Sequence, residues 1–198
     1  MNVHLFPCEI PTEDDCNRIQ ASYLFQQMEA FSGDFLTQHA DALAYYNQQW
    51  CDDPLHAWSR RWEYPWVYQQ IFAHLDGRPA RILDAGSGIT FFGLFLERTL
   101  GAEMTYWDHD PSIVDTLRAM GRHAEYRDLS DASEESASFD VVYCISVLEH
   151  TPRPLHTLAS LLRAVTPGGL FVCTVDIPRV PGILGAMDMS VCGMRVIG

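Results

Sequence analysis

The stretch that most constrains the fold is residues 81–91, with the sequence RILDAGSGITF. A short apolar run ends in Asp84, and two glycines, Gly86 and Gly88, follow it one residue apart. This order predicts a buried strand that runs into a tight turn and then a helix. In a dinucleotide-binding turn, G-x-G-x-x-G, the third glycine lets the helix pack closely against the strand. Phe91 stands at that third position, so the turn disfavours a nicotinamide cofactor.

The region 79–198 alternates between strand-like apolar runs and helix-like segments. Its expected strands are 80–84, 102–107, 124–127, 139–145 and 169–175, and its expected helices are 91–100, 111–120 and 155–165. Alternation of this kind predicts an α/β fold of the Rossmann-like, doubly wound type, in which a mostly parallel sheet carries helices on both faces. A chain of 198 residues is long enough for one such domain with a full core.

Region 1–78 is expected to form a helical, aromatic-rich cap on the main domain. Its expected helices lie between Thr12 and a break at 32–34, over 35–50, and from Pro65 to about Gly77. Four of the five tryptophans lie between residues 50 and 66. These rings either attach the cap to the main domain or line a ligand pocket.

The composition argues against several functions. The formal net charge is −13 and every one of the 13 basic residues is an arginine, so a polyanion such as DNA or RNA would be repelled. No apolar run approaches the roughly 20 residues of a membrane span, and the first residues do not resemble a signal peptide. We therefore expect a cytoplasmic protein that binds neither membrane nor nucleic acid. The six cysteines include no C-x-x-C pair, which favours free thiols over a zinc site, and no metal is expected.

Acidic residues follow three of the expected strands, at Asp84, Asp108 and Asp128. Ligands of such sheets bind outside the carboxyl ends of the strands. A single acid in this position often caps the next helix, as Asp110 can do before Pro111. The three acids together predict a pocket for a ligand that offers hydroxyl and amine donors but no phosphate.

Further motifs occur in a fixed order: WDHDP at 107–111, YRDL at 126–129, SFDVV at 138–142, VLEH at 147–150 and LRAVTPGG at 162–169. Together with the turn, this order resembles that of the class I S-adenosylmethionine-dependent methyltransferases, in the branch that acts on small molecules. The resemblance covers residues 81–178, about half of the chain. It implies that S-adenosyl-L-methionine is the cofactor and that its methyl group passes by in-line displacement to an oxygen or nitrogen atom of a small molecule.

The resemblance also implies roles for the first two motifs. The backbone of Gly86, Ser87 and Gly88 would approach the methionine part of the cofactor, and Asp84 would support its amino group. Asp108 would accept hydrogen bonds from both ribose hydroxyls, which are among the stronger kinds because the acceptor is charged.

Five other residues are carried over from the family in the same way. His109 would lie beside the adenine ring. Asp128 would accept from the adenine amine, and Leu129 would supply a backbone contact. Cys144 and Ile145 would sit under the cofactor near the sulfonium.

The sequence departs from the family pattern at two places. Thr90 stands where the family usually has a third glycine. The family sheet usually finishes with an antiparallel pair of strands, but only 23 residues follow Val175, with room for one short strand at about 191–197. The closing strands are therefore expected to be incomplete, because the chain is truncated, naturally short or half of an assembly. An uncovered edge of the strand 169–175 would invite a homodimer.

An oxygen or nitrogen acceptor can also need a group that takes its proton. His150 is the candidate catalytic residue, with His109 and Asp176 as less favoured candidates; the alternative is that His150 only shapes its loop.

Given this resemblance, the cap of region 1–78 should cover the cofactor and form part of the acceptor pocket. The methionine carboxylate of the cofactor needs a cationic partner. Tyr64 together with Arg60 or Arg61 could reach it, unless these side chains serve only packing or a surface ion pair.

Two other functions compete with methyl transfer. A shortened domain that binds the cofactor or a partner without catalysis would account for the brief C-terminal region. An NAD-dependent oxidoreductase is disfavoured by Phe91 and by the acid that precedes the turn.

Overall fold

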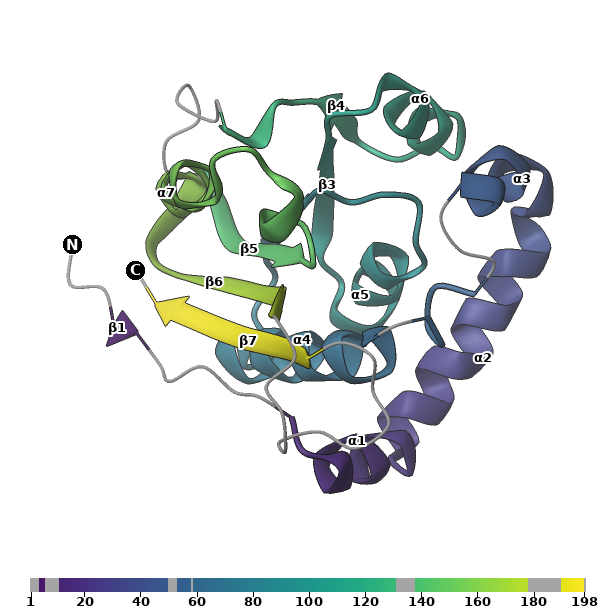
Figure 1. Cartoon of the computed structure of the whole chain (residues 1–198), viewed down its shortest axis with the longest axis horizontal. Helices are drawn as coiled ribbons and strands as arrows, with labels where there is room; N and C mark the ends of the chain where they lie inside the picture. The colour runs from purple at the N-terminus through teal and green to yellow at the C-terminus, as the bar shows by residue number, and fades with distance from the viewer. Residues whose placement is uncertain are drawn as a thin grey trace.

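The structure, a computed structural model, describes residues 4–5, 11–49, 53–57, 59–130, 138–177 and 190–197. Within these residues a sheet runs in the order β1-β7-β6-β5-β2-β3-β4 (Figure 1). Its strands are β1 (His4–Leu5), β2 (Arg81–Ala85), β3 (Glu103–Asp108), β4 (Ala124–Tyr126), β5 (Phe139–Ile145), β6 (Val165–Ile177) and β7 (Ser190–Ile197). The helices are α1 (Glu13–Gln20), α2 (Tyr23–Gln38), α3 (Ala40–Gln49), α4 (Arg60–Leu75), α5 (Phe92–Leu100), α6 (Pro111–Ala119) and α7 (Pro154–Ala164).

The five strands from β6 to β4 are parallel to one another, which confirms the predicted α/β class. β2, β3 and β4 begin and end within one residue of the expected positions, and β5 has the predicted bounds. β6 begins four residues before and ends two residues after the expected strand 169–175. Apolar residues of the sheet alternate between its faces, as the period of a strand requires. Ile82 and Tyr143 belong to the core beneath α4, α5 and α6, whereas Leu83 and Val142 belong to the core beneath α7. Both faces are therefore covered by helices.

The helices before residue 78 share the core of the sheet. Buried residues of α1, α2 and α4 lie in one continuous hydrophobic cluster with α5, α6 and the sheet face beneath them. Trp62 and Trp66 of α4 stack with their ring centroids 5.2 Å apart and are buried in that cluster. The packing interpretation therefore applies to these two tryptophans, while Trp50 and Trp58 lie outside the described residues.

The first helix begins as predicted, but the next boundary is elsewhere. Thr12 and Asp15 form a capping box at the start of α1. The predicted break at 32–34 is wrong, because α2 runs through these residues. A glycine in a helix costs only about 1 kcal/mol, and α2 gains more by burying Phe25 and Phe35. The chain breaks instead before α2, where the Ser22 hydroxyl accepts the N–H of Phe25 at 3.2 Å. It breaks again at His39, so the predicted helix 35–50 is divided between α2 and α3.

The predicted start of α4 at Pro65 is also wrong. The helix begins at Arg60, where the carbonyl of Ser59 accepts the N–H groups of Trp62 and Glu63. Pro65 therefore lies inside the helix, a position that typically costs about 3 kcal/mol. The residues around it, 62–67, are all buried, and burial of their large side chains offsets that cost. The helix ends as predicted, with Asp76 in the left-handed conformation before the glycine.

The expectation of an uncovered edge on the last parallel strand is wrong. β7 pairs antiparallel with β6 from Leu170 to Ile177, and β1 from the start of the chain pairs antiparallel with β7. Figure 1 shows β1 beside β7, with both chain ends on the same side of the molecule. The sheet is closed by one strand from each end of the chain, so the edge on which the homodimer expectation rested is occupied within the protein.

Two further observations concern the described residues only. None of their helices combines the length and the apolar character that a bilayer crossing requires. No group of three or more His, Cys, Asp or Glu side chains among them is arranged to hold a metal ion. Cys16, Cys144 and Cys173 are buried free thiols.

Glu63 is the polar link between α4 and the sheet. It has no exposed surface, and its carboxylate accepts hydrogen bonds from Ser59 Oγ at 2.9 Å and from Ser146 Oγ at 2.7 Å. Arg60 Nη1 and Thr174 Oγ1 donate to the same carboxylate. Ser146 follows β5 and Thr174 lies in β6. A buried carboxylate is tolerated only when it is paired and hydrogen-bonded, so these donors fix where α4 packs.

We expect Glu63→Gln to lower the free energy of unfolding by about 2 kcal/mol, because the substitution removes the charge that pairs with Arg60 and replaces acceptors by an amide donor. Urea unfolding followed by circular dichroism measures this change. Glu103→Gln, at the exposed start of β3, is the matched control and should change stability by less than about 0.5 kcal/mol. Equal stability of the two variants would show that the Glu63 network does not hold α4.

Candidate functional site

One pocket collects most of the predicted site residues. It has a volume of about 570 Å³ and lies at the carboxyl ends of β2, β3, β5 and β6, beneath α3 and α4. The predicted residues in its lining are Tyr64, Asp84, Gly86, Ser87, Gly88, Asp108, His109, Ile145 and His150. Its position is where ligands of parallel sheets bind.

The glycine turn lets a ligand approach the backbone closely. Gly86 and Gly88 have φ angles of 78° and 54°, in the left-handed region that side chains other than glycine rarely adopt. A Cβ on Gly86 would lie 2.6 Å from Val147 Cγ2, and one on Gly88 would lie 2.5 Å from the hydroxyl of Tyr46. Both glycines are therefore required by the turn and by its neighbours.

Phe91 shows why this turn differs from a dinucleotide-binding one. Its ring is fully buried at the start of α5 and meets the Tyr64 ring edge-on at 5.4 Å. Tyr64 also stacks on Phe92 at 4.8 Å and hydrogen-bonds to Thr90. Thr90, which replaces the family's third glycine, thus connects the turn to α4. Burial raises the pKa of the Tyr64 hydroxyl well above its usual value.

Asp108 ends β3 with a buried carboxylate that supports the turn. Its Oδ2 accepts the Gly88 N–H at 2.9 Å and its Oδ1 accepts the Asp110 N–H at 3.0 Å. Each oxygen has a second lone pair that a ligand hydroxyl can use. His109 extends from the same strand end with an exposed ring whose Nδ1 is 3.4 Å from Asp108 Oδ1.

Asp84 ends β2 on the same side, and only 5% of its surface is exposed. The hydroxyl of Tyr143 donates to Asp84 Oδ2 at 2.6 Å. Burial raises the pKa of Asp84 to about 7, although the Tyr143 hydrogen bond lowers it, and the nearby charge of Asp108 adds to the increase. Near neutral pH this carboxyl group therefore gains its charge readily when a cation binds beside it.

Arg60, not Arg61, belongs to the pocket lining. Its side chain is mostly buried and donates to Glu63, and its guanidinium lies 5.9 Å from the centre of the Tyr64 ring. Burial opposes its charge, but the attraction of Glu63 outweighs that effect and raises the pKa of Arg60. The pocket thus holds a permanent cation at the end formed by α4.

His150 and Asp176 form another part of the wall. His150 closes a 3₁₀ turn (Leu148–His150) after β5, and its side chain is exposed. Asp176 lies near the end of β6, and its N–H donates to Glu149 Oε1 at 3.0 Å. His150 follows β5, and Asp176 lies near the end of the neighbouring strand β6. Two groups able to accept a proton therefore lie at the same edge of the sheet.

Three predicted residues do not line the pocket. The exposed Asp128 accepts the N–H and the hydroxyl of Ser130 at 2.9 and 2.7 Å, so it caps a local turn, and Leu129 is buried in the core beneath α7. Their contacts with an adenine ring stay predictions. Cys144 also faces α7, because successive residues of a strand point to opposite faces and Ile145 faces the pocket.

The sequence analysis missed several pocket residues. Tyr143 follows from the same alternation, since it lies two residues before Ile145 and on the same face. Tyr46 of α3 gives no local signal. Its hydroxyl reaches the backbone of Ile89 in the turn, and burial raises its pKa. Ser146 has a φ of 47°, which no sequence pattern indicates for a serine.

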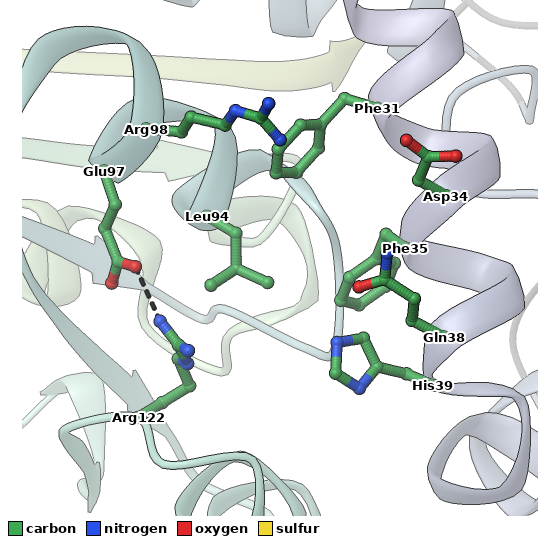
Figure 2. Close-up of a pocket in the computed structure, with 9 residues that line it drawn as sticks. All are labelled: Phe31, Asp34, Phe35, Gln38, His39, Leu94, Glu97, Arg98 and Arg122. Atoms are coloured by element: carbon green, nitrogen blue, oxygen red, sulfur yellow. Dashed lines mark hydrogen bonds and ion pairs between the residues drawn. The ribbon is translucent and has the colours of Figure 1, made fainter.

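A second pocket, of about 400 Å³, lies between α2 and α5 (Figure 2). Phe31 and Leu94 contribute apolar surface, and the Arg98 guanidinium lies 5.7 Å from the Phe31 ring centre. Arg122 Nη1 contacts Glu97 Oε2 at 2.6 Å. None of the predicted site residues lines this pocket.

Comparison with known proteins identifies the family to which the chain belongs. Residues 55–188 match the family described as a methyltransferase domain. The curated ubiquinone biosynthesis O-methyltransferase of Xanthomonas oryzae pv. oryzae is 33% identical over 179 residues, which cover 84% of this chain and 70% of that protein.

Solved structures share the fold at low identity. The magnesium protoporphyrin IX methyltransferase of Synechocystis PCC 6803, with bound S-adenosylmethionine, has a TM-score of 0.54 at 14% identity and aligns over 69% of this chain and 78% of that one. A sugar N-methyltransferase from Streptoalloteichus sp. ATCC 53650 has a TM-score of 0.50 at 19% identity, over 61% and 49% of the two chains. Fold, motif order and relatives lead to one conclusion: the chain belongs to the class I S-adenosylmethionine-dependent methyltransferases, and S-adenosyl-L-methionine is its cofactor.

Proposed function

We propose that this methyltransferase acts on a hydroxyl oxygen of a small molecule. The observation that carries the proposal is the single pocket that joins the glycine turn, Asp84 and Asp108 to His150 and Asp176. The relative that is 33% identical is named an O-methyltransferase, which supports oxygen over nitrogen as the acceptor atom. When bound, the cofactor supplies a methyl group already activated by its sulfonium.

The residues of the pocket fit this cofactor. Asp108 would accept the ribose hydroxyls with the lone pairs that Gly88 and Asp110 leave unused, and His109 would lie beside the adenine. Asp84 would hold the ammonium group above the turn formed by 86–88. These assignments are supported by two buried carboxylates that face one pocket, since buried carboxylates need donors or cations.

Residues from region 1–78 would complete the cofactor site and bound the acceptor. Arg60, oriented by Glu63, would pair with the methionine carboxylate, because a guanidinium matches a carboxylate in shape and charge. Tyr64 would form the wall beside it. Tyr46 of α3 would cover the turn, so that α3 and α4 exclude water from the reacting atoms.

The acceptor end of the pocket would be bounded by His150 and Asp176. Either side chain can accept a proton, and neither needs a metal ion for that role. Methyl transfer itself mainly requires that the acceptor oxygen be held in line and close to the methyl carbon.

Calorimetric titration of the protein with S-adenosylhomocysteine and with NADH tests the assignment of the pocket. We expect S-adenosylhomocysteine to bind and NADH to give no heat of binding, because Phe91 stands where a dinucleotide-binding turn has the glycine that lets its helix pack closely against the strand. Binding of NADH alone would contradict the proposed function. Binding of the thioether without turnover of a broad hydroxyl panel would favour the non-catalytic alternative.

Asp108→Ala should weaken S-adenosylhomocysteine binding by about 10- to 100-fold, on the scale of a lost charged hydrogen bond. The calorimetric Kd measures the change, with Asp115→Ala on the exposed face of α6 as the control. Asp108→Asn keeps an acceptor for the Gly88 N–H, so its intermediate affinity would separate ligand contact from support of the turn. Unchanged affinity in both Asp108 variants would rule out the ribose assignment.

Cofactor affinity should fall as the pH drops below about 7. The pKa of Asp84 is raised to about 7 by burial in the free protein, and a bound ammonium favours the charged form and lowers that pKa. Binding below pH 7 must therefore release a proton, and the affinity for S-adenosylhomocysteine should decrease by up to about tenfold per pH unit. Asp84→Asn should bind weakly and with little pH dependence. The same slope in both proteins would assign the titration to another group.

A further inference from the structure

Asp176 has a backbone fixed by hydrogen bonds at the acceptor end of the pocket. The N–H of Asp176 donates to Glu149 Oε1 at 3.0 Å. In the sheet, Asp176 pairs with Val191 of β7. Its side chain lines the pocket. The Oδ1 atom is shielded from solvent and receives no hydrogen bond from any described residue, so this carboxylate has acceptor capacity that the described part of the protein does not use.

The charges around Asp176 come from α4 and from the 3₁₀ turn after β5. Burial raises the pKa of Asp176 to about 6, Glu63 and Glu149 add to the increase, and Arg60 and His150 oppose it. The guanidinium of Arg60 donates to Glu63 and therefore lies against the carboxylate of Glu63. A carboxylate with a raised pKa is a stronger base than an ordinary one and is still ionised at neutral pH.

We propose that Asp176, rather than His150, takes the proton of the acceptor hydroxyl during methyl transfer. This inference rests on the proposed function. His150 has an exposed side chain on a short turn, whereas Asp176 is half-buried in β6, where it pairs with Val191 of β7. A base on a fixed strand loses less freedom when the acceptor binds, and it holds the oxygen in line with the methyl group.

The step balances in atoms and charge. The acceptor oxygen forms a bond to the methyl carbon, and the electron pair of the broken carbon–sulfur bond returns to sulfur and neutralises the sulfonium. The hydroxyl proton passes to the carboxylate of Asp176, which becomes neutral. Solvent later removes that proton.

The same charges indicate the class of acceptor. Asp176, Glu149 and Glu63 lie together, and the cation nearest to them, Arg60, donates to Glu63. An acceptor that carried a carboxylate or phosphate next to its reacting oxygen would be repelled there. A neutral hydroxyl on an uncharged ring or chain would instead donate to Asp176.

The test uses 4-nitrophenol, which is yellow only as the anion, with S-adenosylhomocysteine present so that no methyl transfer occurs. The carboxylate of Asp176 would accept a hydrogen bond from the neutral phenol and repel its anion. The bound probe should therefore ionise at a higher pH than the free probe, and Asp176→Asn should abolish this shift. Asp115→Asn, an exposed site on α6, and His150→Gln should keep the shift.

Activity gives the second measurement. With S-adenosylmethionine, loss of the yellow colour reports methylation of the probe, and Asp176→Asn should lower kcat by about 100-fold or more. Its calorimetric affinity for S-adenosylhomocysteine should stay within about twofold of the wild-type value, which shows that the variant folds and keeps the cofactor end.

Two outcomes would overturn the inference while leaving the proposed function standing. One is a probe shift that survives Asp176→Asn but disappears in His150→Gln. The other is wild-type protein that binds S-adenosylhomocysteine yet leaves the ionisation of 4-nitrophenol unchanged. Failure to bind S-adenosylhomocysteine would instead reject the proposed function itself, so the two failures are distinct.

Discussion

The buried carboxylate of Glu63 is the interaction on which the geometry of the site depends. It accepts donors from the start of α4, from the residue after β5 and from β6. A charge without exposed surface is stable only while those donors are in place, so the helix and two strand ends are fixed relative to one another. Ser146 holds a left-handed backbone conformation in this arrangement, at a cost that its hydrogen bonds to Glu63 and to Thr174 offset. Arg60 and Tyr64, which belong to the same helix, are thereby directed into the pocket.

The pocket combines two acids at its cofactor end with two more groups at the acceptor end. Asp84 and Asp108 are both buried, and the charge of Asp108 raises the cost of charging Asp84 in the absence of a ligand. A cationic sulfonium and its ammonium relieve that cost, whereas the thioether product has lost the sulfonium charge. If Asp84 and Asp108 bind the cofactor as proposed, they would favour the methyl donor over the demethylated product through this difference in charge. The difference would also help the product to leave once the methyl group has moved.

The sequence predicted the elements whose signals are local. The strand 139–145, the glycine turn and the helix start at Thr12 each depend on a few neighbouring residues, and the structure has all three. The predicted helix boundaries at Pro65 and at 32–34 were wrong, because tertiary burial outweighed the unfavourable helix propensity of these residues. Glu63 gave no sequence signal, since its partners Ser146 and Thr174 lie 83 and 111 residues away. Cys144 was assigned to the pocket by family resemblance together with Ile145, although two consecutive strand residues cannot face the same side.

The pairing of β1 with β7 has a consequence for the order of folding. The strand at residues 4–5 finds its partner at residues 196–197, so this contact closes a loop that spans nearly the whole chain. Such a contact forms late, because the loss of chain entropy on closure is repaid only after the intervening structure has formed. During synthesis the parallel strands and their helices can assemble while β6 still lacks its antiparallel neighbour. Until residues 190–197 leave the ribosome, the hydrogen-bonding edge of β6 is open to other chains, so the nascent protein passes through a stage at which it is prone to aggregate.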